Sequence, residues 1–201
     1  MQEPVSAHSS LIFATHNNHK LEEVSQLIGS GIKLLSLTDI GIHAEIVENG
    51  NSFEENALIK SKFIYEQTGK NCFSDDSGLE IDSLAGAPGI FSARYSGSRD
   101  MKENLELVLH NMVGQVTRTA RFICVICLIM GGEPVYFSGK IEGVILNEPM
   151  GDTGFGYDPI FRPIGYALSF AEMDAGIKNK ISHRAIAMQA LNTYLKSQYL
   201  L

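Results

Sequence analysis

Apolar positions along this chain change repeatedly between two spacings, which predicts alternating strands and helices. Residues 11–15 form a short apolar run, and Leu21, Val24, Leu27 and Ile28 then recur at helical spacing. Strand-like runs with helix-like repeats between them are typical of an α/β domain.

The rest of the chain continues this alternation. Residues 52–55 match a capping box, which predicts a helix to about Gln67. Gly131 and Gly132 predict the turn of a β-hairpin. The other predicted elements are strands over 33–37, 71–74, 79–82, 120–130, 135–138 and 141–146, and helices over 101–112 and after Ser182. We therefore expect one α/β domain over residues 11–198, with a central mixed β-sheet flanked by helices, and a disordered extension over residues 1–10.

Composition narrows the classes of protein to consider. The 201 residues carry a net charge of −7, with a pI near 5.3, which argues against general nucleic-acid binding because such binding needs a basic face. The longest apolar run, residues 122–130, is too short for a membrane span, and residues 1–10 do not resemble a signal peptide. Three cysteines fit a reducing compartment, so we expect a cytoplasmic protein with no membrane partner.

Cys124 and Cys127 have the spacing of a metal or redox motif, but they lie within a predicted strand. Residues three apart in a strand point to opposite faces, so two such thiols do not easily share a metal ion. We interpret them as buried structural cysteines.

The first candidate site follows the first predicted strand. Lys20 falls in the first turn of a helix, where the helix dipole disfavours a cation. A bound phosphate would reverse this penalty, whereas the alternative is a solvated lysine. The candidate phosphate-binding residues are Thr15, His16, Asn17, Asn18, His19 and Lys20. The chain contains no Walker A motif, so a P-loop NTPase is not expected.

The second candidate site lies on the helix after Ser52. Lys60 aligns with the apolar residues Ala57 and Ile64, and Asn56 lies one turn earlier on nearly the same face. Most such lysines extend to solvent, but one beside a cleft can direct its ammonium at an anion.

The third candidate site is the run from Asp75 to Gly78, with Glu48 and Glu55 upstream. Adjacent carboxylates at a strand end repel each other unless a cation or a proton intervenes. Oxygen ligands of this kind suit Mg²⁺, and the alternative is an Asp-rich turn.

The fourth candidate site lies near the C-terminus. Residues 154–159 place two aromatic rings among glycines, with a carboxylate before a proline. Such a loop can stack a ring on a nucleobase and offer a carboxylate to its polar edge, or it can be a simple turn. Lys178, His183 and Arg184 bring cations to the same part of the chain. Together, the four sites predict a pocket for a nucleoside polyphosphate that is attacked by an activated water.

These residues resemble the inosine triphosphate pyrophosphatase family. The similar motifs are Thr15-x-Asn17-x-x-Lys20, residues 52–57 with Lys60, and residues 74–79, 86–90, 92–95, 154–159 and 181–184. They follow the order of the family over residues 11 to about 195. His16 stands where the family commonly has glycine, which would narrow the phosphate loop.

The resemblance implies Mg²⁺-dependent hydrolysis of ITP, dITP and XTP to the monophosphate and pyrophosphate, by a homodimer of elongated α/β protomers. It implies that Asp76 is the general base, that Glu48 and Asp76 bind the metal, and that Asp75, Glu55 and Asn56 support them. The implied substrate-binding residues are residues 15–20 with Lys60, Ser77, Phe155, Gly156, Tyr157, Asp158, Lys178, His183 and Arg184. Two alternatives are a pyrophosphatase for other modified nucleotides, such as dUTP, and a nucleotide-binding protein without turnover.

Overall fold

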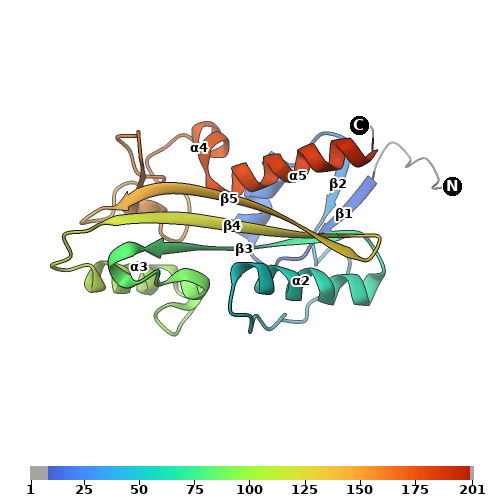
Figure 1. The fold of residues 1–201 in the computed structure, drawn as a ribbon, viewed down its shortest axis with the longest axis horizontal. Coiled ribbons are helices and arrows are strands. Elements are labelled where there is room, and N and C mark those ends of the chain that lie inside the picture. The colour runs from blue at the N-terminus through green and yellow to red at the C-terminus, as the bar shows by residue number, and fades with distance from the viewer. Residues whose placement is uncertain (1–8, 200–201) are drawn as a thin grey trace. The chain divides into compact units, whose positions relative to one another are not determined.

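The strands form one mixed sheet in a computed structural model that describes residues 9–199 (Figure 1). The elements are β1 (Ser9–Phe13), α1 (Asn18–Leu27), β2 (Ile32–Leu35), α2 (Phe53–Thr68), β3 (Cys72–Ile81), α3 (Met101–Asn111), β4 (Thr119–Met130), β5 (Glu133–Ile145), β6 (Phe161–Pro163), α4 (Ala175–Ile181) and α5 (His183–Tyr199), with 3-10 helices η1 (Asp82–Leu84), η2 (Gly89–Arg94) and η3 (Asp158–Ile160). The strand order is β2-β1-β3-β4-β5-β6. β1 is parallel to β2 and β3, and β5 is antiparallel to β6, so the predicted mixed sheet is confirmed.

The chain divides into two compact units. The first unit contains the described residues up to Asp76, Val125–Ser138 and the chain from Ala187, and the second contains Ser77–Cys124 and Gly139–Ile186. β3, β4, β5 and α5 each contribute residues to both units, and β3 passes from one to the other between Asp76 and Ser77.

In the first unit both faces of the sheet are buried. Ile12 and Cys72 are paired residues of β1 and β3, and they share a core cluster with Ala57 of α2. The next residue pair, Phe13 and Phe73, points to the other face and stacks with ring centroids 4.7 Å apart. α2 and α5 lie on opposite sides of these strands (Figure 1), so each face has a covering helix.

Aromatic side chains dominate the core of the second unit. The Phe122 ring lies 4.6 Å from that of Phe161 and 6.0 Å from that of Phe170. The same cluster includes Leu105 and Val108 of α3, which confirms the predicted amphipathic helix. This core supports the residues of η3 and α5 that form part of the candidate site.

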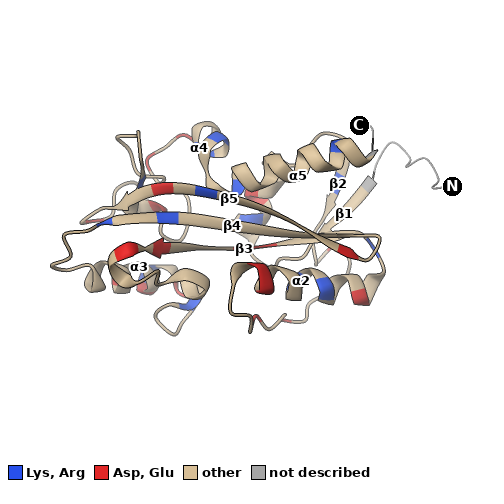
Figure 2. Cartoon of the chain, viewed as in Figure 1, with Lys and Arg blue, Asp and Glu red and all other residues tan. Residues whose placement is uncertain are grey.

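The cap predicted for α2 is also confirmed. The Ser52 side chain accepts a hydrogen bond from the backbone N–H of Glu55 at 3.1 Å. The first turn of the helix is acidic, as Figure 2 shows, and negative charge stabilises the N-terminal end of a helix.

Several predicted boundaries are wrong. β3 is one continuous strand over Cys72–Ile81, whereas the sequence predicts two strands around an Asp-rich segment. The reason is that Ser74, Asp75 and Asp76 are buried and find polar partners on other elements, which their residue types do not predict. α4 and β6 are missing from the prediction, and the two strands predicted after Gly132 are one, β5.

β1 begins at Ser9, so the last two residues of the extension expected over residues 1–10 belong to a strand. Residues 1–8 lie outside the described part of the chain. Over residues 9–199, none of the helices combines the length and the apolar character needed to cross a membrane.

Candidate functional site

The loop from Thr15 to Lys20 is held by its own polar side chains. Asn17 caps α1 by accepting a hydrogen bond from the backbone N–H of Lys20, and Thr15 accepts one from the backbone N–H of Asn17, both at 3.1 Å. His16 Nε2 lies 3.0 Å from the carbonyl oxygen of Ala44. His16, Asn17, Asn18 and His19 are exposed. This loop therefore presents polar groups at the N-terminal end of α1, where an anion is favoured.

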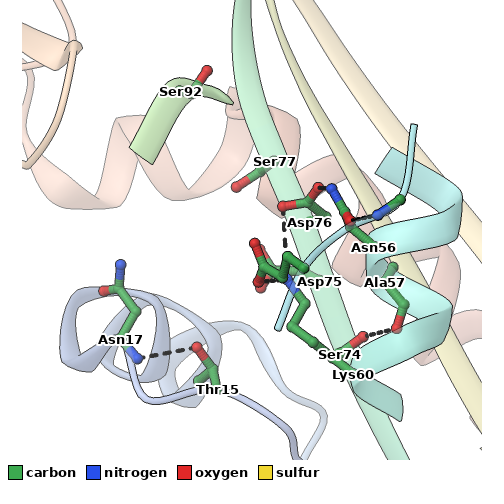
Figure 3. Close-up of polar contacts among 12 residues, drawn as sticks. Thr15, Asn17, Asn56, Ala57, Lys60, Ser74, Asp75, Asp76, Ser77 and Ser92 are labelled. Carbon is green, nitrogen blue, oxygen red and sulfur yellow. Dashed lines mark hydrogen bonds and ion pairs between the residues drawn. The ribbon is translucent and has the colours of Figure 1, made fainter. Parts of the chain in front are cut away.

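Asp75 and Asp76 lie in the middle of β3, and each has its own lysine. Successive side chains of a strand point to opposite faces, and the contacts follow that rule. Asp75 accepts a 3.0 Å hydrogen bond from Nζ of Lys20 on α1. Asp76 lies on the side of α2, where its Oδ1 is 3.6 Å from Nζ of Lys60 (Figure 3). The expected repulsion between adjacent carboxylates is thus relieved by two lysines on two helices.

Lys60 also joins Asp76 to Glu48. Its Nζ lies 2.6 Å from Glu48 Oε1, and its side chain is only 8% exposed. Burial alone would lower the pKa of Lys60, but the carboxylates of Asp76 and Glu48 outweigh burial and raise it. Burial raises the pKa of Asp76, although the nearby cations of Lys60 and Lys20 oppose that shift. An additional cation beside Asp76 would therefore stabilise its ionised form.

Asn56 fixes the orientation of Asp76. It is completely buried on α2, donates from Nδ2 to Asp76 Oδ2 at 3.0 Å, and accepts from the backbone N–H of Gly50 at 2.9 Å. Glu55 does not join this group in the way the resemblance implies. It is exposed, and its Oε2 accepts a 2.7 Å hydrogen bond from the backbone N–H of Asn51. Its observed contact supports the start of α2.

The oxygen donors of this group fit Mg²⁺. Over residues 9–199, no cluster of three or more His, Cys, Asp or Glu side chains is arranged to hold a metal ion. Glu48 and Asp76 are two carboxylates that already contact one shared cation, the ammonium of Lys60. Mg²⁺ is commonly held by one or two carboxylates together with waters and substrate phosphates, so a pair is sufficient.

In the second unit, Asp158 and Lys178 form a buried ion pair. Lys178 Nζ lies 2.8 Å from Asp158 Oδ2, and the same oxygen accepts a 2.8 Å hydrogen bond from the backbone N–H of Phe155. The ammonium lies 5.4 Å from the centre of the Phe155 ring and 5.6 Å from that of Phe170. The sequence predicts Asp158 as a contact for the base, whereas its observed contacts orient Lys178 and the Phe155 loop.

Arg184 and His183 begin α5 beside that loop. The Arg184 guanidinium lies 5.7 Å from the centre of the Phe155 ring and donates to Ser77 Oγ at 2.9 Å. His183 stacks on Phe122, with ring centroids 4.7 Å apart and planes inclined by 10°. The second unit therefore brings together Ser77, Phe155, Lys178, His183 and Arg184, as predicted.

Tyr157 has a different environment from the one predicted. It is 4% exposed, and its hydroxyl donates a 2.8 Å hydrogen bond to the carbonyl of Ser92. Burial raises its pKa, so the hydroxyl stays protonated and holds the loop against η2. Gly156, also predicted to bind substrate, is half-buried with a φ of 61°, a backbone conformation that favours glycine.

Sequence reasoning missed two residues of this group. Phe122, which supports His183, belongs to an apolar strand and gives no sign of a special role. Ser92 lies in one of the quoted motifs, and its hydroxyl accepts from the backbone N–H of Leu79 at 2.9 Å, so that motif was the available signal. Cys124 and Cys127 are completely buried, which confirms their interpretation as core residues.

Comparison with known proteins supports the resemblance. A model described as the Ham1 family matches residues 11–194. A dITP/XTP pyrophosphatase of Christiangramia forsetii is 49% identical over 186 residues, covering 92% of this chain and 98% of that protein. One from Bacillus subtilis is 43% identical over 191 residues, covering 92% and 96%. The solved structure of a HAM1 protein from Coxiella burnetii is 38% identical, with a TM-score of 0.87, covering 94% of this chain and 99% of that one.

Proposed function

Since this chain belongs to the Ham1 family, we propose that it hydrolyses dITP, ITP and XTP to the nucleoside monophosphate and pyrophosphate. The observation that carries the proposal is the group of Asp76, Glu48 and Lys60, in which a buried and a half-buried carboxylate share one buried cation. Such a group can hold a divalent ion and activate a water, which a protein that only binds nucleotides does not need.

The residues proposed for the phosphates lie on α1, on α2 and around Asp76. Lys20 and Lys60 would neutralise phosphate oxygens, and the backbone N–H groups at the start of α1 would donate to them. Glu48 and Asp76 would hold Mg²⁺, which when bound stabilises the negative charge that develops on the phosphates. Asp76 would accept a proton from the attacking water. The water oxygen then bonds to the α-phosphorus while the bond to the α–β bridging oxygen breaks, and pyrophosphate leaves.

The residues proposed for the base are Phe155, Lys178 and Arg184. Phe155 offers an aromatic face, and Lys178 and Arg184 offer hydrogen-bond donors. The 6-oxo group of hypoxanthine or xanthine accepts hydrogen bonds from such donors. The 6-amino group of adenine donates instead of accepting, so an adenine base would forgo a charge-assisted hydrogen bond worth about 1.5–3 kcal/mol, or roughly 10- to 150-fold in specificity.

The test is pyrophosphate release with Mg²⁺ from equal concentrations of dITP, XTP, dGTP, dATP and dUTP. We expect fast release from dITP and XTP, and none from Asp76→Asn. Asp152→Asn is the matched control, because it makes the same change at an exposed aspartate. Preference for dUTP would favour the alternative pyrophosphatase, and binding without turnover would favour a nucleotide-binding protein. The homodimer and the cytoplasmic location stay predictions.

A further inference from the structure

The ammonium of Lys60 contacts Glu48 and Asp76, the two carboxylates that would otherwise be available to a metal ion. Its Nζ is 2.6 Å from Glu48 Oε1. The same Nζ is 3.6 Å from Asp76 Oδ1, and Figure 3 shows these two side chains. The Lys60 and Asp76 side chains are 8% and 9% exposed, so water screens this interaction only weakly. In the protein without ligands, Lys60 is thus the counter-ion of both carboxylates.

A divalent ion on the same two carboxylates would compete with this ammonium. Both carboxylates that Lys60 contacts are ones that the proposed function assigns to Mg²⁺, and two cations beside the same carboxylates repel each other, most strongly at buried Asp76 and less at Glu48, which is 27% exposed. The charge balance changes when a triphosphate arrives, because its oxygens offer Lys60 a new anionic partner. Lys60 can then turn to the phosphates and leave Glu48 and Asp76 to the metal.

We infer that Lys60 makes metal binding conditional on nucleotide, by occupying the Glu48–Asp76 pair until a triphosphate draws its ammonium away. This inference rests on the proposed function. Linkage requires the reciprocal effect: whatever factor nucleotide adds to metal affinity, metal adds to nucleotide affinity. A protein built this way holds little metal between substrates and binds metal and triphosphate together.

Lys20 pairs with a different carboxylate from the two that Lys60 contacts. Its Nζ pairs with Asp75, at 3.0 Å from Oδ1 and 3.5 Å from the backbone carbonyl. Asp75 points to the other side of β3 from Asp76, so Lys20 does not link the two proposed metal ligands. Lys20 acts on Asp76 only at longer range and more weakly than Lys60, so we expect it to bind phosphate with a smaller effect on the metal.

The experiment measures Mn²⁺ binding by electron paramagnetic resonance in the absence of nucleotide. We expect Lys60→Met to bind Mn²⁺ at least about tenfold more tightly than wild type, because one competing charge has been removed. Lys62→Met, which loses the same charge from the exposed face of α2, should stay within about twofold of wild type. Lys60→Arg, which keeps the charge, should bind as weakly as wild type.

Equal Mn²⁺ affinity in wild type and Lys60→Met would overturn the inference, as would equally tight binding to Lys60→Arg and Lys60→Met. Adding Asp76→Asn to Lys60→Met should abolish the gain, and a gain that persists would place the metal elsewhere and also overturn it. A cooperative thermal transition of Lys60→Met without metal, followed by circular dichroism, shows that the variant is folded. Pyrophosphate release by wild type is assayed separately, so loss of the proposed function would be distinguished from failure of this inference.

Discussion

The ion pair between Asp158 and Lys178 leads to a prediction whose size follows from its burial. Asp158 is 3% exposed and Lys178 8%, and their charged atoms are 2.8 Å apart. Asp158→Asn keeps the size of the side chain but leaves the ammonium buried without its counter-charge. Removing one partner of a buried pair costs about 3–5 kcal/mol. The rings of Phe155 and Phe170 still attract the cation, so we expect a loss near the lower limit, about 3 kcal/mol.

A double-mutant cycle separates the pair from its surroundings. Lys178→Met fills similar volume without charge and leaves Asp158 with the backbone N–H of Phe155 as a remaining partner. The variant Asp158→Asn with Lys178→Met leaves neither charge buried alone. Its loss of unfolding free energy should therefore be smaller than the sum of the two single losses by about 2 kcal/mol or more.

The assay is urea unfolding followed by far-ultraviolet circular dichroism, without metal or nucleotide. The chain has no tryptophan, so circular dichroism reports on folding better than fluorescence does. A loss below about 1 kcal/mol for Asp158→Asn would refute the argument, because a buried charge cannot lose its partner so cheaply. Additive single losses would refute it equally, since they would mean that the two side chains do not stabilise each other.

Three further variants or measurements test other parts of the structure. Gly154→Ala should destabilise the protein more than Gly156→Ala, as measured by urea unfolding. Both glycines have a positive φ, which costs an alanine about 1 kcal/mol, but only at Gly154 would the added Cβ overlap the buried carboxylate of Asp158. Asn56→Ala should lower the unfolding free energy by about 2 kcal/mol and slow pyrophosphate release, because the backbone N–H of Gly50 and the carboxylate of Asp76 each lose the hydrogen bond that Asn56 makes. Burial raises the thiol pKa of Cys72 to about 12 and that of Cys127 to about 11, so neither should react with Ellman's reagent at pH 8 until urea unfolds the chain. Unfolded thiols ionise near pH 9 while these stay protonated, so the unfolding free energy should fall as pH rises from 9 toward 12.

The strongest sequence predictions concern segments whose residues interact locally. The capping of α2 by Ser52, the helix containing Leu105 and Val108, and the turn at Gly131 and Gly132 are all found in the structure. Caps, helical periodicity and glycine turns depend on neighbours a few residues away, so the sequence carries them directly. The ordered motifs identified the family for the same reason, since each is a short run of residue types.

The errors lie where partners are distant in the sequence. The residue types around Asp75 and Asp76 predict a turn between two strands, because they do not show where counter-charges would come from. A strand that buries two carboxylates is stable only when Lys20 and Lys60 from two helices reach it. The predicted role of Tyr157 in binding the base stays a prediction; what the sequence did not predict is that its hydroxyl donates to the carbonyl of Ser92, 65 residues earlier in the chain.

The sequence by itself determined the α/β class, the main helices and the family, because propensity, periodicity and motif order are local properties. Tertiary structure alone decided how those residues are partnered: Lys60 with both Glu48 and Asp76, Asp158 with Lys178, and Phe122 under His183. The physical reason is burial. A charged side chain removed from water must find a counter-charge or a hydrogen bond, and only the folded chain determines which distant residue supplies it.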